Sequence, residues 1–98
     1  MTRRLKFHAL AQRDFTAIGP RSELAWGKTR TRRYLDELER QTQRIVENPM
    51  LGHDAELPRP RLRRITAGRD VIFYKFDDAQ LEIVRILYEA MDFEARLR

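Results

Sequence analysis

Apolar side chains recur every three or four residues across residues 29–48, which is the clearest periodicity in the chain. The stripe consists of Tyr34, Leu35, Leu38, Thr42, Ile45 and Val46. Charged and amide side chains occupy the positions between them, so the segment predicts an amphipathic helix with one buried face. We expect the helix to end at Asn48-Pro49, because a residue that precedes proline is pushed out of the helical region.

A helical pattern also covers residues 9–18 and is followed by Gly19-Pro20. Proline lacks the backbone N–H and clashes with the preceding helical turn, although it is tolerated in a first turn. We therefore expect the first helix to break here and a second helical piece to run from Pro20 to Trp26.

The apolar spacing changes to two in the other segments. Residues 5–8 alternate and predict a short strand. Residues 70–76 and 81–88 are apolar on both faces, which is typical of central strands. Residues 61–66 predict a weaker strand, because Leu62 and Ile65 have opposite parity, as at a bulge or a sheet edge.

Strict alternation assigns the side chains of the two central strands to faces. In the first of them, Val71 and Phe73 lie opposite Ile72, Tyr74 and Phe76. In the second, Leu81, Ile83 and Leu87 lie opposite Val84, Ile86 and Tyr88.

Short turn segments separate the last strands, at residues 67–69 and 77–79, and tight turns make neighbouring strands antiparallel. Residues 91–97 predict a short terminal helix. The expected fold is α+β: an N-terminal strand, a helical hairpin and a three-stranded antiparallel meander in one sheet, with the helices on one face. We expect residues 1–98 to form a single domain.

Charge is distributed in blocks along the chain. The formal net charge of +5 divides into +7 over residues 1–35, −4 over 36–58, +5 over 59–75 and −3 over 76–98. Patches of opposite sign steer charged partners, and they also serve as solvated faces that keep a protein soluble. Both interpretations apply to this chain.

Several classes of protein are excluded by composition. The chain has no cysteine, which excludes a disulfide scaffold and thiolate chemistry, and its longest apolar run, residues 71–74, is too short to span a membrane. Standard nucleotide-binding and hydrolase motifs are missing, and His8 and His53 are isolated in sequence. We expect no catalytic residue, no metal and no cofactor, and we expect a cytoplasmic protein.

The basic stretch in residues 59–75 is the strongest candidate for a binding site. It contains Arg59, Arg61, Arg63, Arg64, Arg69 and Lys75. Arginine forks suit phosphate and carboxylate groups, so nucleic-acid phosphates and an acidic protein are both candidate ligands, and a charged edge strand is the structural alternative. Arg61 and Arg63 share parity and are expected to point the same way. Trp26 is a further candidate, either as a cap on the helical hairpin or as an anchor for a partner.

Three stretches of the chain resemble a known family. Residues 34–38 and 45–52 read YLDEL and IVENPMLG, residues 62–65 and 68–74 read LRRI and GRDVIFY, and residues 83–92 read IVRILYEAMD. In this order and spacing they resemble the ParE-type toxins of the RelE/ParE superfamily, the toxin half of bacterial type II toxin–antitoxin pairs. The chain departs from the family pattern at Tyr88, where histidine is common, and at Gly19-Pro20.

The resemblance implies a growth-inhibiting toxin with one of two activities. RelE-like members cleave ribosome-bound mRNA with basic residues and often a C-terminal tyrosine, whereas Glu89, Asp92 and Glu94 make this terminus acidic. We therefore prefer a ParE-like toxin without chemistry of its own that binds DNA gyrase. The alternatives are an mRNA endonuclease that uses Arg61, Arg63, Arg64 and Arg69, and an inactive homologue that only binds its antitoxin.

The resemblance also implies a partner and a set of positions. The partner is a ParD-like antitoxin with an acidic, initially disordered C-terminal tail, in a hetero-oligomer that involves no membrane and no sequence-specific nucleic-acid binding. The tail suits the basic strand region and the helical hairpin. The family-motif positions, expected to be mainly structural, are Tyr34, Leu38, Pro49, Leu51, Gly52, Gly68, Phe73, Tyr74, Arg85, Met91 and Asp92.

Overall fold

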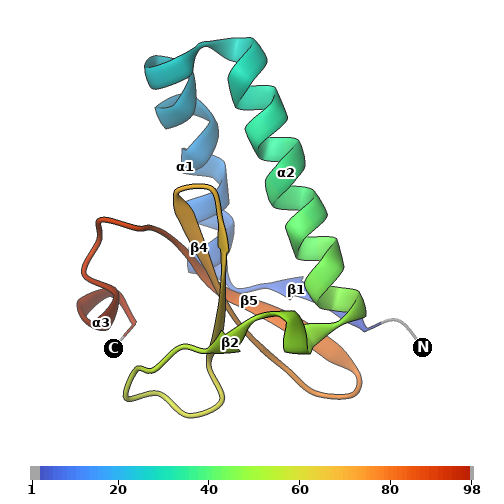
Figure 1. The fold of residues 1–98 in the computed structure, drawn as a ribbon. Coiled ribbons are helices and arrows are strands. Elements are labelled where there is room, and N and C mark those ends of the chain that lie inside the picture. Colours follow the sequence, from blue (N-terminus) through green and yellow to red (C-terminus); the bar gives the residue numbers. More distant parts are fainter. Residues whose placement is uncertain (1–2, 98) are drawn as a thin grey trace.

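The computed structural model describes residues 3–97; Met1, Thr2 and Arg98, which belong to the expected domain, lie outside the described residues. The elements in chain order are β1 (Arg4–Phe7), α1 (Ala9–Trp26), α2 (Lys28–Glu47), the 3₁₀ turn η1 (Pro49–Leu51), β2 (His53–Asp54), β3 (Arg63–Ala67), β4 (Asp70–Phe76), β5 (Gln80–Tyr88) and α3 (Phe93–Arg96). They form one sheet in the order β1-β5-β4-β3-β2, in which β1 is parallel to β5 and the other neighbours are antiparallel (Figure 1). The predicted α+β fold is confirmed.

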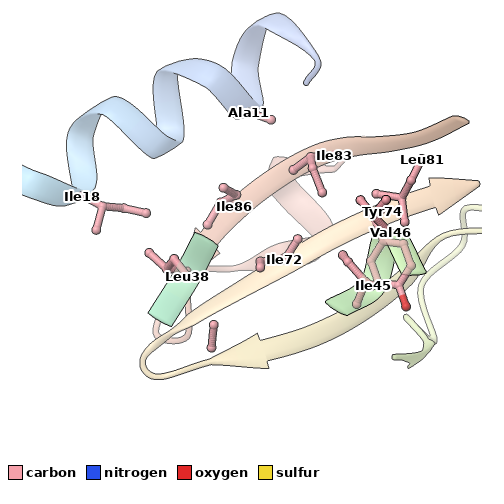
Figure 2. Close-up of a cluster of buried hydrophobic side chains, with 11 residues drawn as sticks. Ala11, Ile18, Leu38, Ile45, Val46, Ile72, Tyr74, Leu81, Ile83 and Ile86 are labelled. Atoms are coloured by element: carbon pink, nitrogen blue, oxygen red, sulfur yellow. The ribbon is translucent and has the colours of Figure 1, made fainter. Parts of the chain in front are cut away.

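Both long helices cover one face of the sheet and bury the main core there (Figure 1). Figure 2 shows Ala11 and Ile18 of α1 and Leu38 of α2 pointing toward Ile72 and Ile86 on the strands. The stripe predicted for the second helix is the face that is buried, as its heptad-like spacing requires.

A second, smaller core lies on the opposite face of the sheet. Phe73 is its centre, and the rings of Phe73 and Phe93 meet edge to face with centroids 5.1 Å apart. The loop that follows β2 contributes Ala55 and Leu62, and Leu97 closes the cluster from the end of α3. This packing explains why both faces of β4 are apolar, as the sequence predicts.

The predicted break at Gly19-Pro20 is wrong, because α1 continues through Pro20 to Trp26. Proline in a helix leaves the carbonyl four residues earlier, here that of Thr16, without its usual N–H partner. Thr16 and Pro20 are both exposed, so the carbonyl without its partner lies on the solvent side of the helix. Ile18 and Ser22 remain buried on either side of the proline, and Ile18 packs in the helix-side core.

The predicted faces of the last strand are partly wrong, because the ladder between β4 and β5 contains an irregularity. Phe73 pairs with Arg85 while Tyr74 pairs with Ile83, so Val84 is an extra residue in β5. An inserted residue shifts the alternation beyond it. As a result Ile86 packs with Leu81 and Ile83 in the helix-side core, and Leu87 packs with Val84 in the second core.

The connection from α2 to β3 also differs from the prediction. It contains η1 and the short strand β2, which pairs with Arg63 and Arg64 at the sheet edge. Strand β3 begins at Arg63, and Arg61 lies before it with a φ of 65°. The expectation that Arg61 and Arg63 share one side of a strand is therefore wrong, because a residue with positive φ belongs to a turn.

Candidate functional site

A buried carboxylate ties three elements together near the turn between α1 and α2. Asp70 is the first residue of β4 and is only 1% exposed. Nη2 of Arg21, on α1, donates to both carboxylate oxygens at 3.0 and 2.9 Å. The hydroxyl of Tyr34, on α2, donates to Oδ2 of Asp70 at 2.5 Å. A buried charge that is paired and hydrogen-bonded in this way fixes the relative position of its partners.

Tyr34 also holds the β3–β4 turn in place. Its hydroxyl accepts the backbone N–H of Arg69 at 3.1 Å, and its ring fills the space in which a Cβ on Gly68 would lie. Gly68 has a φ of 61°, which glycine adopts without strain. Burial, followed by the hydrogen bond and the charge of Asp70, raises the pKa of Tyr34 well above its usual value, so the phenol is neutral.

Next to this network, side chains from the end of α1, the first half of α2 and the β3–β4 turn form a shallow hollow. We call this hollow the hairpin-tip surface. It consists of Trp26, Arg30, Arg33, Tyr34, Gly68 and Arg69. The Trp26 and Tyr34 rings meet at 75° with centroids 5.3 Å apart, and the guanidinium of Arg30 lies 4.8 Å from the Trp26 ring. Trp26 and Arg69, two of the predicted binding residues, are brought together here. The β3–β4 turn contacts α2 at Tyr34, and in Figure 1 this turn points toward the end of the molecule where α1 and α2 are connected.

The remaining predicted arginines do not form one patch. Arg63 donates to the carbonyls of Gly52 and Met50, so it holds η1 against the sheet. Arg59 donates to the carbonyl of Leu97 at 3.4 Å, and Arg61 is exposed in the loop. Arg64 follows Arg63 on β3, so its side chain lies on the opposite face of the sheet, and it is half-buried. The basic stretch is therefore divided between a structural residue, an exposed loop, a sheet face and the hairpin tip.

A groove of roughly 840 Å³ runs between β1 and the two long helices. Its apolar floor consists of Leu5, Phe7 and Phe15, and its rim carries both signs of charge, including Arg40, Arg44, Asp36, Glu39 and Glu47. Strand β1 lies at the edge of the sheet, so one side of its backbone is open beside this groove.

The open part of the second sheet face carries a polar cluster. Lys6 and Lys75 flank Glu82 in adjacent strands, and Nζ of Lys75 lies 3.9 Å from Oε2 of Glu82. Nε2 of His8 lies 3.0 Å from Oε1 of the same carboxylate. His8 therefore has a carboxylate partner that its isolation in the sequence conceals.

Several family-motif positions meet around the hydroxyl of Tyr74. This fully buried hydroxyl donates to the carbonyl of Pro49 at 2.6 Å and accepts the N–H of Gly52 at 3.0 Å. A Cβ on Gly52 would overlap this hydroxyl and lie 2.6 Å from the carbonyl of Arg64. The exit of α2 is thus fastened to β4 at these positions.

Other motif positions have different surroundings. Leu38 and Phe73 are buried in the two cores, whereas Leu51 and Met91 stay exposed. Asp92 caps α3 by accepting the N–H of Ala95. Arg85 forms a two-fold ion pair with Asp14 at 2.7 and 3.0 Å, and Asp14 also accepts the N–H of Ile86. These last contacts close the edge of β5 beyond its pairing with β1.

Sequence reasoning missed Arg21, Arg30, Arg33 and Asp70 as parts of the site. Arg30 and Arg33 lie beside the Trp26 that the sequence indicates, but their spacing is that of any exposed helix face. Asp70 has a weak signal, since it is the one acidic residue within the basic block of residues 59–75. Its partner Arg21 is 49 positions away, and no local pattern reports such a contact.

Two features that other classes of protein would show are not found in residues 3–97. No group of three histidine, aspartate or glutamate side chains is placed to hold a metal ion, and no helix is long and apolar enough to cross a membrane.

Comparison with known proteins gives relatives over nearly the whole chain. The family described as "ParE toxin of type II toxin-antitoxin system, parDE" matches residues 5–93. Toxin ParE1 of Mycobacterium tuberculosis is 32% identical over 73 residues, which cover 74% of each chain. The family match extends from the first strand to the start of the terminal helix, so it includes the hairpin tip and the groove.

Solved structures agree on the fold. A chain of the chromosomal ParDE system from P. aeruginosa superposes with a TM-score of 0.75 at 17% identity, covering 89% of this chain and 96% of that one. A chain of the E. coli DinJ–YafQ toxin–antitoxin complex gives a TM-score of 0.70 at 13% identity, covering 92% and 96%. With the family match and the identity to Toxin ParE1, the conclusion is that this chain belongs to the ParE toxin family of the type II toxin–antitoxin system parDE.

Proposed function

We propose that this toxin inhibits DNA gyrase by binding it and has no chemistry of its own. The observation that carries the proposal is the hairpin-tip surface, which displays arginine and aromatic side chains on elements locked by Asp70. Aromatic and arginine side chains on a rigid support are typical of residues that dominate binding at protein interfaces. Membership of the ParE family supports gyrase as the target.

A supercoiling assay with purified gyrase tests this function. We expect the toxin to reduce supercoiling and to trap cleaved DNA, and the same toxin premixed with its antitoxin to have neither effect. Unchanged supercoiling together with no cleaved DNA at a large excess of active, folded toxin would exclude gyrase as the target.

We propose a ParD-like antitoxin with an acidic C-terminal tail as the partner that neutralises the toxin. A disordered tail that folds on binding needs apolar surface to offset the entropy of ordering, and the groove beside β1 supplies Leu5, Phe7 and Phe15. Exposed Met50 and Leu51 follow the end of α2, where Glu47 lines the groove. A tail in this groove would meet the apolar floor and the guanidinium groups of Arg40 and Arg44 on the rim.

Glutamate substitutions in the groove test this path. Gln12 and Gln43 are exposed and line the groove, so the double variant Gln12→Glu/Gln43→Glu adds negative charge without disturbing the core. We expect it to weaken antitoxin binding about 10-fold at low salt. The control Leu24→Glu/Ala25→Glu adds the same charge at exposed positions of α1 outside the groove. Equal weakening of antitoxin binding by both variants would mean that the tail does not bind in this groove.

A ribosome-dependent mRNA endonuclease is the second candidate, and the cluster of His8, Glu82 and Lys75 favours it. Cleavage at a ribose 2′-OH needs a base and a cation near the scissile phosphate, and this cluster holds both types of group. The fold shared with a chain of the DinJ–YafQ complex is compatible with this activity. Mapping of mRNA ends in cells that express the toxin tests this function. Cuts at fixed codon positions that disappear in the Glu82→Gln variant would favour it over gyrase binding.

A further inference from the structure

We propose that the hairpin-tip surface binds the phosphodiester backbone of duplex DNA. The inference rests on the proposed function for its setting, since gyrase holds DNA, and it adds that the toxin contacts the DNA itself. The binding expected is independent of base sequence, because the surface offers cations rather than a set of donors and acceptors spaced to read base edges.

The arginines of the hairpin-tip surface are not neutralised by ion pairs within the described residues. Arg30, Arg33 and Arg69 line the hollow, and none of them takes part in an ion pair among residues 3–97. The buried Asp70 is paired with Arg21 instead. Glu89 is the acidic side chain whose charge acts on Arg69, and it is exposed. Three guanidinium groups are therefore available to an external anion.

Two of these guanidinium groups are held in position before a ligand arrives. Arg30 lies over the ring of Trp26, and Nη1 of Arg69 donates to the hydroxyl of Tyr88 at 3.1 Å. The guanidinium of Arg21 also lies over the Tyr88 ring, 5.0 Å from its centroid. A guanidinium that is already oriented loses less conformational entropy when it binds a phosphate.

DNA fits this surface better than an acidic tail does. A tail that folds on binding needs a run of apolar contacts, and aliphatic side chains are not among the residues that line the hollow. The groove beside β1 supplies such contacts, on another part of the molecule. A duplex is already ordered and presents a dense row of phosphates, so it needs only the cations that the tip provides.

Trp26 makes the site directly observable, because it is the only tryptophan in the chain. Titration of the toxin with a duplex oligonucleotide, without gyrase, should change its intrinsic fluorescence. Three phosphate contacts predict a fall in affinity of about 40-fold between 50 and 200 mM salt. Poly-glutamate and a duplex RNA of the same sequence serve as competing ligands.

Matched variants separate the tip from general charge attraction. Arg30→Gln/Arg33→Gln removes two cations of the hollow, whereas Arg13→Gln/Arg32→Gln removes two exposed cations of the long helices that do not line it. Binding of a labelled duplex, followed by anisotropy, should weaken at least about 10-fold in the first variant, and the salt slope should fall by about two. The control should stay within about twofold of wild type.

The outcomes distinguish this inference from the proposed function. Equal losses in both variants, no fluorescence response to DNA, or tighter binding of poly-glutamate or RNA than of DNA would overturn it. If DNA binding fails while gyrase is still inhibited, the inference is wrong and the function stands. If DNA binding holds while gyrase is unaffected, the surface is a DNA site and gyrase is not the target.

Discussion

Nη2 of Arg21 donates to both carboxylate oxygens of Asp70, and this contact joins α1 to the first residue of β4 across 49 positions of sequence. Replacement of Asp70 by asparagine would leave the guanidinium without its counter-charge and remove one strong acceptor of the Tyr34 hydroxyl. We expect Asp70→Asn to lower the free energy of unfolding by about 2–4 kcal/mol, measured by urea denaturation.

Asp78→Asn is the matched control for this prediction. Asp78 is exposed in the β4–β5 turn, so its replacement should change the free energy of unfolding by less than about 0.5 kcal/mol. Equal effects of the two substitutions would mean that Asp70 does not organise the hairpin tip.

Tyr34 makes stability depend on alkaline pH. Burial and Asp70 raise its pKa in the folded protein above the value of 10.0 that applies to the unfolded chain. A raised folded pKa contributes stability that is complete below the unfolded pKa and is lost as pH rises through the folded one. We expect Tyr34→Phe to cost about 1–2 kcal/mol near neutral pH, and its deficit relative to wild type to shrink as pH rises above 10.0.

Urea denaturation of both proteins at roughly pH 8 and pH 10.5 measures this change. Tyr88→Phe, in which a half-buried phenol beside Arg69 is altered, provides the comparison. A deficit of Tyr34→Phe that is the same at both pH values would contradict the shift.

Two glycines should respond to alanine in opposite ways. Gly52→Ala places a Cβ against the Tyr74 hydroxyl and the Arg64 carbonyl, so we expect it to destabilise the fold by at least about 2 kcal/mol. Gly19→Ala meets only Leu35 Cδ1 at 4.0 Å within a helix, so it should stabilise by about 0.5–1 kcal/mol. Thermal unfolding of both variants gives the comparison, and a loss of stability in Gly19→Ala would show that α1 is not helical there.

The contrast between these positions shows what the sequence can and cannot predict. The buried face of α2 and the two faces of β4 follow from periodicity alone, because each is a repeat within one element. The predicted faces of β5 are wrong beyond Val84, because an inserted residue reverses the alternation of side chains and no sequence pattern indicates the insertion. The roles of Arg63 and Asp70 could not be predicted for another reason. They depend on backbone carbonyls and a guanidinium group that come from distant segments of the chain.

Pro20 offers a test of the continuous first helix. Alanine at this position restores the N–H that the carbonyl of Thr16 lacks and has a higher helix propensity. Because Pro20 is exposed, no packing is lost, and we expect Pro20→Ala to raise the free energy of unfolding by about 1–3 kcal/mol. A lower midpoint of thermal unfolding would indicate that the backbone conformation fixed by proline is needed to fit α1 on the sheet.

Arg63 and Arg64 are adjacent on β3, but their replacement should have different consequences. Arg63 donates to the carbonyls of Gly52 and Met50, so Arg63→Glu should lower the stability of the fold itself. Arg64 has no hydrogen bond or ion pair through its side chain within residues 3–97, so Arg64→Glu should lower the unfolding midpoint less than Arg63→Glu does. It should weaken binding of the acidic antitoxin tail by about 5–10-fold at low salt and by less at high salt, because salt screens exposed charges. Calorimetric titration at two salt concentrations measures both effects, and an affinity that does not respond to Arg64→Glu at either concentration would confine the tail to the groove beside β1.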